Sequence, residues 1–219
     1  MQEPQGLTQL LLASQSPRRR DLLEAAGLPF VVVEPGDENA FDLPPYGDHA
    51  PDQAAVLRAR AKAAGAEPHG HAGILLAVDT IVTLAGRIFG KPRDEDEARS
   101  TLATLTGEPH EVVTAHAFRR VFHAAADRKP APEALRVEVS RARVLLEARP
   151  AEDVERYLAS RDWADKAGGY GIQSEAADFA RLIDGRYDTV VGLDVSVVDR
   201  VFREWTSCPD GGDRLRSWG

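Results

Sequence analysis

A basic, hydroxyl-rich segment near the N-terminus has the residue types of an anion site. An apolar run at residues 10–13 is followed by Ser14, Gln15, Ser16 and Pro17, and then by three arginines. Ser16 suits the N-cap of a helix, and Pro17 suits its first position, where a missing N–H costs nothing. Three arginines in a first helical turn oppose the helix dipole, whose positive end lies there. A bound anion would compensate them, because N–H groups at a helix start and guanidinium groups both suit phosphate.

The three arginines are expected to point in different directions. At about 100° per residue, the apolar stripe that begins at Leu22 centres close to the direction of Arg19. Arg18 flanks this stripe, whereas Arg20 points mostly away from it. A solvated cluster is the usual interpretation of a charge run. The helical geometry instead favours a phosphate role for Arg18 and Arg19 and leaves Arg20 to solvent.

Asp79 is the best single candidate for acid–base chemistry. It follows a continuous apolar segment at residues 74–78 that predicts a buried strand. Open α/β sheets bind ligands at the ends of their strands, although an aspartate there is also a common turn former. Lys91 and Lys166 both lie in glycine-flanked loops. Carboxylates, lysines and a basic helix start together describe a polyphosphate–Mg²⁺ site.

Composition limits the class of protein. The chain has 219 residues, 43% of them hydrophobic, which allows one sizeable core. Its net charge of −8 argues against a protein that binds duplex nucleic acid, whereas a small charged ligand needs only a local basic pocket. There is no apolar run long enough to span a membrane and no signal-peptide pattern, and Cys208 is the single cysteine. We therefore expect a cytoplasmic protein without internal disulfides, nucleic-acid partners or membrane partners.

Known motifs of several other site classes are missing. The six histidines do not show the ligand spacings of zinc sites. The glycine-rich segments match neither a P-loop nor a dinucleotide fingerprint, and there is no nucleophilic serine elbow.

Strand and helix patterns alternate along the chain and predict an α/β fold. Residues 10–34 form a strand–helix–strand unit, which implies parallel neighbours in a sheet. The other expected strands pair in hairpins, at 81–84 with 88–89, at 112–122 with 135–145, and at 179–183 with 187–191. Further helices are expected at 52–66, 94–105, about 150–160, and from about 193 to 205. Residues 35–51 and 165–173 are expected to be loops, 124–134 a poorly ordered excursion, and 207–219 a disordered tail.

Several motifs together resemble the Maf family of nucleoside triphosphate pyrophosphatases, in that family's order from about Leu10 to Phe202. The main ones are Ser14-x-Ser16-Pro17-Arg18-Arg19-x-x-Leu22, Asp79-Thr80, Gly90-Lys91-Pro92, and Asp165-Lys166-Ala167-Gly168-x-Tyr170-Gly171-Ile172-Gln173. Further matches are Ala59-x-x-Lys62-Ala63, Leu105-x-Gly107-x-x-His110-x-Val112, and Gly185-x-Tyr187-x-x-Val190-Val191-Gly192-Leu193.

The resemblance implies hydrolysis of a nucleoside triphosphate between its α and β phosphates, with Asp79 as proton acceptor. It implies a divalent cation, Mg²⁺ or Mn²⁺, at Glu38 and Asp79. The phosphate-binding positions that follow are Ser14, Ser16, Arg19, Lys62, Lys91 and Lys166. The substrate-selecting positions are Arg18, Thr80 and Gln173, whose residue types imply the dTTP/UTP branch.

The expected protein is a mixed, extended, twisted sheet flanked by helices, in two lobes with the nucleotide in a central cleft. Residues 1–206 form one Maf-like domain, and the resemblance suggests a homodimer. The chain departs from the family pattern in having Asp194 after Val-Val-Gly-Leu, where proline is usual, and Ser174 after Ile-Gln, where glycine is common.

Two alternatives stay open at this level. One is a nucleotide-binding regulator of septum formation and cell division that acts without turnover. The other is a pyrophosphatase of another base preference, for 7-methyl-GTP, CTP or ITP. A pyrophosphatase of either base preference would remove non-standard or excess nucleotides.

Overall fold

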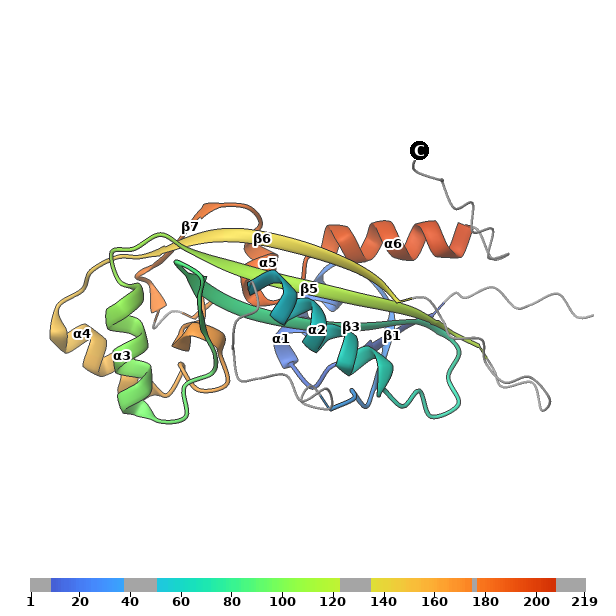
Figure 1. Ribbon diagram of the computed structural model, residues 1–219, viewed down its shortest axis with the longest axis horizontal. Helices are drawn as coiled ribbons and strands as arrows, with labels where there is room; N and C mark the ends of the chain where they lie inside the picture. The colour runs from blue at the N-terminus through green and yellow to red at the C-terminus, as the bar shows by residue number, and fades with distance from the viewer. Residues whose placement is uncertain (1–8, 38–50, 123–134, 175–176, 208–219) are drawn as a thin grey trace, which may run out of the picture.

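The computed structural model describes residues 9–37, 51–122, 135–174 and 177–207. In this part of the chain a seven-stranded mixed sheet has the order β2-β1-β3-β5-β6-β7, with β4 paired to β3 (Figure 1). The strands are β1 (Leu10–Ala13), β2 (Phe30–Val33), β3 (Gly73–Leu84), β4 (Arg87–Phe89), β5 (His110–Val121), β6 (Arg136–Leu146) and β7 (Ala180–Asp184). The helices are α1 (Pro17–Ala25), α2 (Pro51–Ala64), α3 (Glu95–Leu105), α4 (Ala151–Ser160), the 3₁₀ turn η1 (Ala167–Gly169), α5 (Tyr187–Val191) and α6 (Val195–Ser207).

The strand pairings confirm most of the expected architecture. β1 pairs in parallel with β2 and with β3, as the strand–helix–strand unit requires. The β3–β4 hairpin and the long antiparallel β5–β6 pair are also present. The α/β fold class with a mixed, extended sheet is therefore confirmed.

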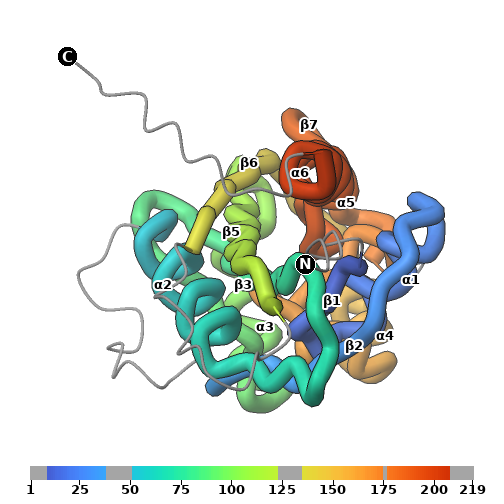
Figure 2. Tube along the Cα trace, turned by 90° about the vertical axis from the view of Figure 1, so that its right-hand side faces the viewer, coloured from blue at the N-terminus to red at the C-terminus, as the bar shows by residue number. Residues whose placement is uncertain are grey.

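Helices cover both faces of the sheet at the end that carries β1 and β2. Alternate residues of β1 and β3 point to opposite faces, so Leu11 and Leu75 pack with the alanines of α2, whereas Leu10 and Ile74 pack with α1 and α6. Figure 2 shows α2 on one side of the strands and α1 and α6 on the other. The small alanine side chains allow the α2 backbone to lie close to the strands.

A third apolar cluster fills the other end of the molecule. It joins β4, the far ends of β5 and β6, α3 and α4, with Tyr157 and Trp163 among its buried residues. Figure 1 shows α3 and α4 gathered at this end, with α6 at the opposite end and α2 nearer the middle. The division of the domain into two lobes stays a prediction.

The structure corrects the expected position of Asp79 in its strand. β3 is one continuous strand of 12 residues, so Asp79 lies in its interior and not at its end. The parallel pairing with β1 stops at Ala13 and Ala77. Asp79 therefore lies just beyond the end of β1. The strand end at which a ligand is expected to bind is thus the end of β1 and not the end of β3.

The last of the three expected hairpins, 179–183 with 187–191, is only half present. Residues 180–184 form β7, but the segment Tyr187–Val191 is the helix α5 and not a strand. Its β-branched residues favoured a strand, but local hydrogen bonds of Asp188 hold the two ends of the helical segment. The Asp188 carboxylate accepts hydrogen bonds from the backbone N–H groups of Thr189 and Val195 and pairs with Arg186.

The remaining helix ends agree closely with the expectations. Ser16 and Asp94 occupy the N-cap positions of α1 and α3, although only Asp94 makes a side-chain capping bond. Asp194 caps α6 by accepting hydrogen bonds from the N–H groups of Ser196 and Val197. Ser207, where the tail was expected to begin, is the last residue of α6. The rest of that tail and the excursion at 124–134 lie outside the described residues. Among the described helices, none combines the length and the apolar character that a membrane span needs.

Candidate functional site

A cleft lies where the end of β1, the start of α1, the middle of β3 and the loop 165–173 meet. Its inner part is a cavity of about 330 Å³, and a second cavity of about 650 Å³ adjoins it. Six residues line both cavities: Ser16, Arg18, Arg19, Lys62, Lys91 and Asp165. The two cavities are therefore parts of one continuous cleft, large enough for a nucleotide.

The cleft brings together the site residues that the sequence analysis singled out. The inner cavity is lined by Ser16, Arg18, Arg19, Lys62, Asp79, Thr80, Lys91, Lys166 and Gln173. Ser14 lines only the second cavity, beside Glu34 and Asp37. Glu38, the other expected metal ligand, lies outside the described residues. As expected, Arg18 and Arg19 are partly buried and Arg20 is exposed.

Asp79 is buried beside a lysine and has one carboxylate oxygen to spare. The residue is 5% exposed, and Lys62 of α2 donates to its Oδ1 at 2.7 Å. Its Oδ2 is buried and has no hydrogen-bond partner among the described residues. A buried polar atom without a partner costs free energy, so such atoms are rare unless they have a function. This oxygen can take a proton from water or bind a cation.

Arg19 ties the start of α1 to β3 and to the end of α5. Its Nε donates to the carbonyl of Gly192 at 2.8 Å, Nη1 to Ser14 Oγ at 3.0 Å, and Nη2 to Thr80 Oγ1 at 3.3 Å. These three acceptors are uncharged. They fix the position of the guanidinium beside the cleft.

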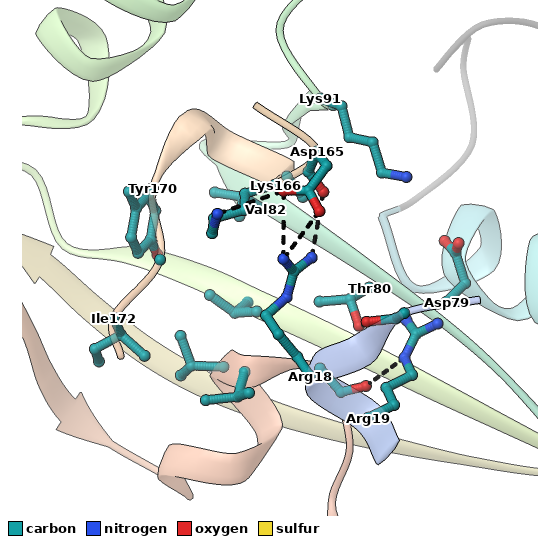
Figure 3. Close-up of a pocket in the computed structure, with 18 of the residues that line it drawn as sticks. Arg18, Arg19, Asp79, Thr80, Val82, Lys91, Asp165, Lys166, Tyr170 and Ile172 are labelled. Carbon is teal, nitrogen blue, oxygen red and sulfur yellow. Dashed lines mark hydrogen bonds and ion pairs between the residues drawn. The ribbon is translucent and has the colours of Figure 1, made fainter. Parts of the chain in front are cut away.

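Arg18 makes a different kind of contact, with a carboxylate from the opposite wall. Its Nη1 donates to Asp165 Oδ2 at 3.1 Å, and its Nη2 donates to the Asp165 carbonyl at 3.3 Å. Figure 3 shows this pair spanning the space between α1 and the loop that carries Lys166. Asp165 has a positive φ of 66°, which is uncommon for a residue with a side chain. The backbone of this loop thus places the carboxylate against Arg18.

A buried histidine supports the wall beside Ile172 and Gln173. His110 Nδ1 lies 3.1 Å from the Glu108 carbonyl, and its Nε2 lies 2.8 Å from the Tyr170 hydroxyl. Because a carbonyl only accepts, Nδ1 carries the proton and the Tyr170 hydroxyl donates to Nε2. Burial lowers the pKa of His110 and raises the pKa of Tyr170, so both groups are held neutral.

Sequence reasoning missed three residues that line the inner cavity. Asp165 and Tyr170 lie in a quoted motif but were given no role, and Arg58 was not singled out. Arg58 precedes Lys62 by one turn of α2, so helical spacing alone could have found it. The partner of Arg18 could not be found this way, because Asp165 lies 147 residues away along the chain.

The described residues provide only part of a metal site. They contain no group of three or more potential side-chain ligands. Mg²⁺, however, is commonly held by one or two carboxylates together with substrate phosphates and water. The spare Oδ2 of Asp79 fits that arrangement.

Comparison with known proteins agrees with this geometry. The family model described as "Maf-like protein" matches residues 9–205. A dTTP/UTP pyrophosphatase of Geobacter sp. (strain M21) is 41% identical over 87% of this chain and 92% of its own length. Proteins of the same name from Thermus thermophilus (38%) and Syntrophomonas wolfei (37%) cover 88% and 85% of this chain and 92% of their own lengths.

Among solved structures, a HAM1 protein from Coxiella burnetii is matched over 90% of this chain and 98% of that chain. The identity is 15% and the TM-score 0.38. The family match, in contrast, spans nearly all described elements and includes every described residue that lines the cleft. The chain belongs to the Maf family.

Proposed function

We propose that this protein is a nucleoside triphosphate pyrophosphatase that hydrolyses dTTP and UTP to the monophosphate and pyrophosphate. The observation that carries the proposal is the buried Oδ2 of Asp79, which has no hydrogen-bond partner in the described part of the chain and lies in a cleft lined by arginines and lysines. The names of the relatives support the pyrimidine substrates. Removal of non-standard or excess nucleotides is the corresponding role in the cell.

Asp79 would take a proton from the attacking water. The water oxygen bonds to the α phosphorus while the bond from that phosphorus to the bridging oxygen breaks, and pyrophosphate leaves with the electron pair. Lys62 would hold the Asp79 carboxylate in place through Oδ1, which leaves Oδ2 to accept the proton. The basic side chains of the cleft would stabilise the charge that grows on the departing pyrophosphate.

A divalent cation fits the same cleft. Asp79 would help to hold it, with Glu38 as the second proposed ligand, and the phosphates would complete its shell. Such an ion supplies charge neutralisation at the phosphates. Whether Mg²⁺ or Mn²⁺ serves is decided by comparing turnover with each.

The base would bind beside Thr80, Tyr170 and Gln173, which all line the inner cavity. Gln173 is exposed at the cavity and offers both a donor and an acceptor. Arg18 offers donors only, which suit the carbonyl oxygens of uracil and thymine.

The test is pyrophosphate release from dTTP, UTP, CTP, ITP and 7-methyl-GTP. We expect dTTP and UTP to give the highest kcat/KM, and Asp79→Asn to lower kcat by about 10²- to 10⁴-fold, the usual contribution of a general base. Asp153→Asn is the matched control, because Asp153 pairs with Arg156 on α4 and is not a cleft residue. Undiminished turnover in Asp79→Asn would rule out the proposed base.

The assembly and location are also proposals. The family resemblance suggests a homodimer, which sedimentation analysis tests, and the single cysteine, Cys208, fits a cytoplasmic location.

A further inference from the structure

Thr80 is one end of a chain of hydroxyl groups that runs from the cleft into the core. Its Oγ1 lies 3.1 Å from Oγ1 of Thr114, a fully buried residue of β5 that is its register partner across the sheet. Thr114 Oγ1 lies 2.8 Å from the backbone carbonyl of Thr189 in α5. Three separate elements thus meet through two side-chain hydroxyls.

The direction of this chain is fixed by its inner end. A carbonyl oxygen can only accept, so the single hydroxyl proton of Thr114 is given to Thr189. Thr114 therefore has no proton for Thr80, and the Thr80 hydroxyl must donate to Thr114. Arg19 Nη2 donates to the same Thr80 oxygen from the other side. The Thr80 hydroxyl has used its proton, and toward the cleft it can only accept.

We infer that Thr114 is a positioning residue for base selection, because it makes Thr80 a pure hydrogen-bond acceptor for the N3–H of a keto pyrimidine. The inference rests on the proposed function and deepens it. Uracil and thymine carry a hydrogen on N3, between two carbonyl groups, whereas N3 of cytosine is an acceptor. A Thr80 hydroxyl that can only accept therefore matches uracil and thymine. With cytosine, the Thr80 oxygen and N3 of the base would be two acceptors facing each other.

The surrounding donors agree with this assignment. Arg18 lines the same cavity as Thr80. It offers only hydrogen-bond donors, which a carbonyl group beside N3–H requires. A site with fixed polar groups discriminates well, because the wrong base leaves a buried group unpaired. Thr114 does not line the cavity itself, so its effect on the base would pass through Thr80.

The experiment compares Thr114→Val with Thr114→Ser. Valine keeps the shape and removes the hydroxyl, so the Thr80 proton becomes available to the cleft. We expect the ratio of kcat/KM for dTTP to kcat/KM for dCTP to fall about tenfold in Thr114→Val, about the value of one hydrogen bond. Thr114→Ser keeps the hydroxyl chain and should keep the wild-type ratio.

A substrate analogue that lacks the N3 hydrogen tests the proposed hydrogen bond from N3–H to Thr80 directly. 3-Methyluridine triphosphate should be a poor substrate of the wild type, and the penalty relative to UTP should shrink in Thr114→Val. Thr83→Val is the matched control, since Thr83 is a buried threonine of β3 that does not line the cavity. It should leave both ratios unchanged, and the urea midpoints of all variants report whether they fold.

The outcomes separate the inference from the function. If folded Thr114→Val keeps the wild-type base ratios while the wild type prefers dTTP and UTP, the polarity argument is wrong and the proposed function stands. If the wild type hydrolyses neither dTTP nor UTP, the proposed function itself is wrong.

Discussion

Arg18 and Arg19 are adjacent residues with different surroundings, and substitution of each by alanine should have a different effect on activity. Arg19 donates to three neutral oxygens on separate elements, including the Gly192 carbonyl at 2.8 Å. We expect Arg19→Ala to lower kcat/KM for all nucleotides by a similar factor and to lower the free energy of unfolding by about 1–3 kcal/mol, because buried oxygens lose their donor. Arg18→Ala should instead change the ratio of kcat/KM values between dTTP and the other nucleotides. Steady-state kinetics and urea unfolding measure both effects, and equal behaviour of the two variants would contradict this division.

The Asp165 carboxylate partly neutralises the positive charge of Arg18 in the cleft. A guanidinium already paired with a carboxylate attracts phosphate less than a bare one does, and its remaining donors are left for uncharged groups. We expect Asp165→Asn to bind inorganic tripolyphosphate several-fold more tightly, as calorimetry would measure. Asparagine tolerates the φ of 66° at this position, so the loop should keep its shape.

The control for Asp165→Asn is Asp153→Asn, which removes the same charge from an ion pair outside the cleft. Its affinity for tripolyphosphate should equal that of the wild type. A weaker affinity in Asp165→Asn would mean that the carboxylate supports phosphate binding through Arg18 and does not compete with it.

At the scale of elements, local patterns predicted the identity of most strands and helices. The apolar run of β1, the Ser16–Pro17 start of α1 and the acidic start of α3 each carry their own signal. The helix α5 did not, because its five residues contain β-branched side chains and it packs against a distant strand, where the Thr189 carbonyl accepts a hydrogen bond from Thr114 of β5. The place of Asp79 inside β3 was hidden for a similar reason, since only the pairing with β1 shows where the parallel part of the sheet ends.

A buried histidine joins β5 to the start of α6. His116 is fully buried, and its Nε2 accepts a hydrogen bond from the backbone N–H of Asp194 at 2.9 Å. Burial lowers the pKa of His116 to about 4, while the carboxylates of Asp194 and Glu138 act in the opposite direction and Arg19 acts in the same direction. The folded protein therefore holds this imidazole neutral at pH 5.

The consequence is a loss of stability in acid. Because the pKa of His116 is about 4 in the folded chain and about 6.5 when unfolded, the unfolded chain takes up a proton first as the pH falls. This group alone should lower the free energy of unfolding by about 2 kcal/mol between pH 7 and pH 5. His116→Gln keeps an acceptor for the Asp194 N–H but does not titrate. Urea unfolding at both pH values should show a smaller loss in this variant, and an equal loss would contradict the assignment.

At the scale of the whole molecule, the site exists only because distant segments converge on β3. The sequence analysis found the residues by type and by motif, and the structure brings the described ones into a single cleft. Their pairings could not be predicted, because Lys62 with Asp79, Arg18 with Asp165 and Thr80 with Thr114 join segments that meet only in the folded chain. The net charge of −8 likewise says nothing of the local basic lining.

This convergence predicts how a nucleotide should protect the protein. The phosphates should contact α2 and the start of α1, whereas the base should contact Tyr170–Gln173, in the loop that forms the wall opposite α1. Hydrogen exchange of the amides should therefore slow at both places with the α,β-imido analogue of dTTP, and only at the first with tripolyphosphate. At a ligand concentration of about 100 Kd, stabilisation by about 2.7 kcal/mol should raise Tm by about 5–10 °C for a chain of this size. Protection of residues 170–173 by tripolyphosphate alone would place the phosphates, and not the base, at that wall, and would reverse the orientation of the nucleotide in the cleft.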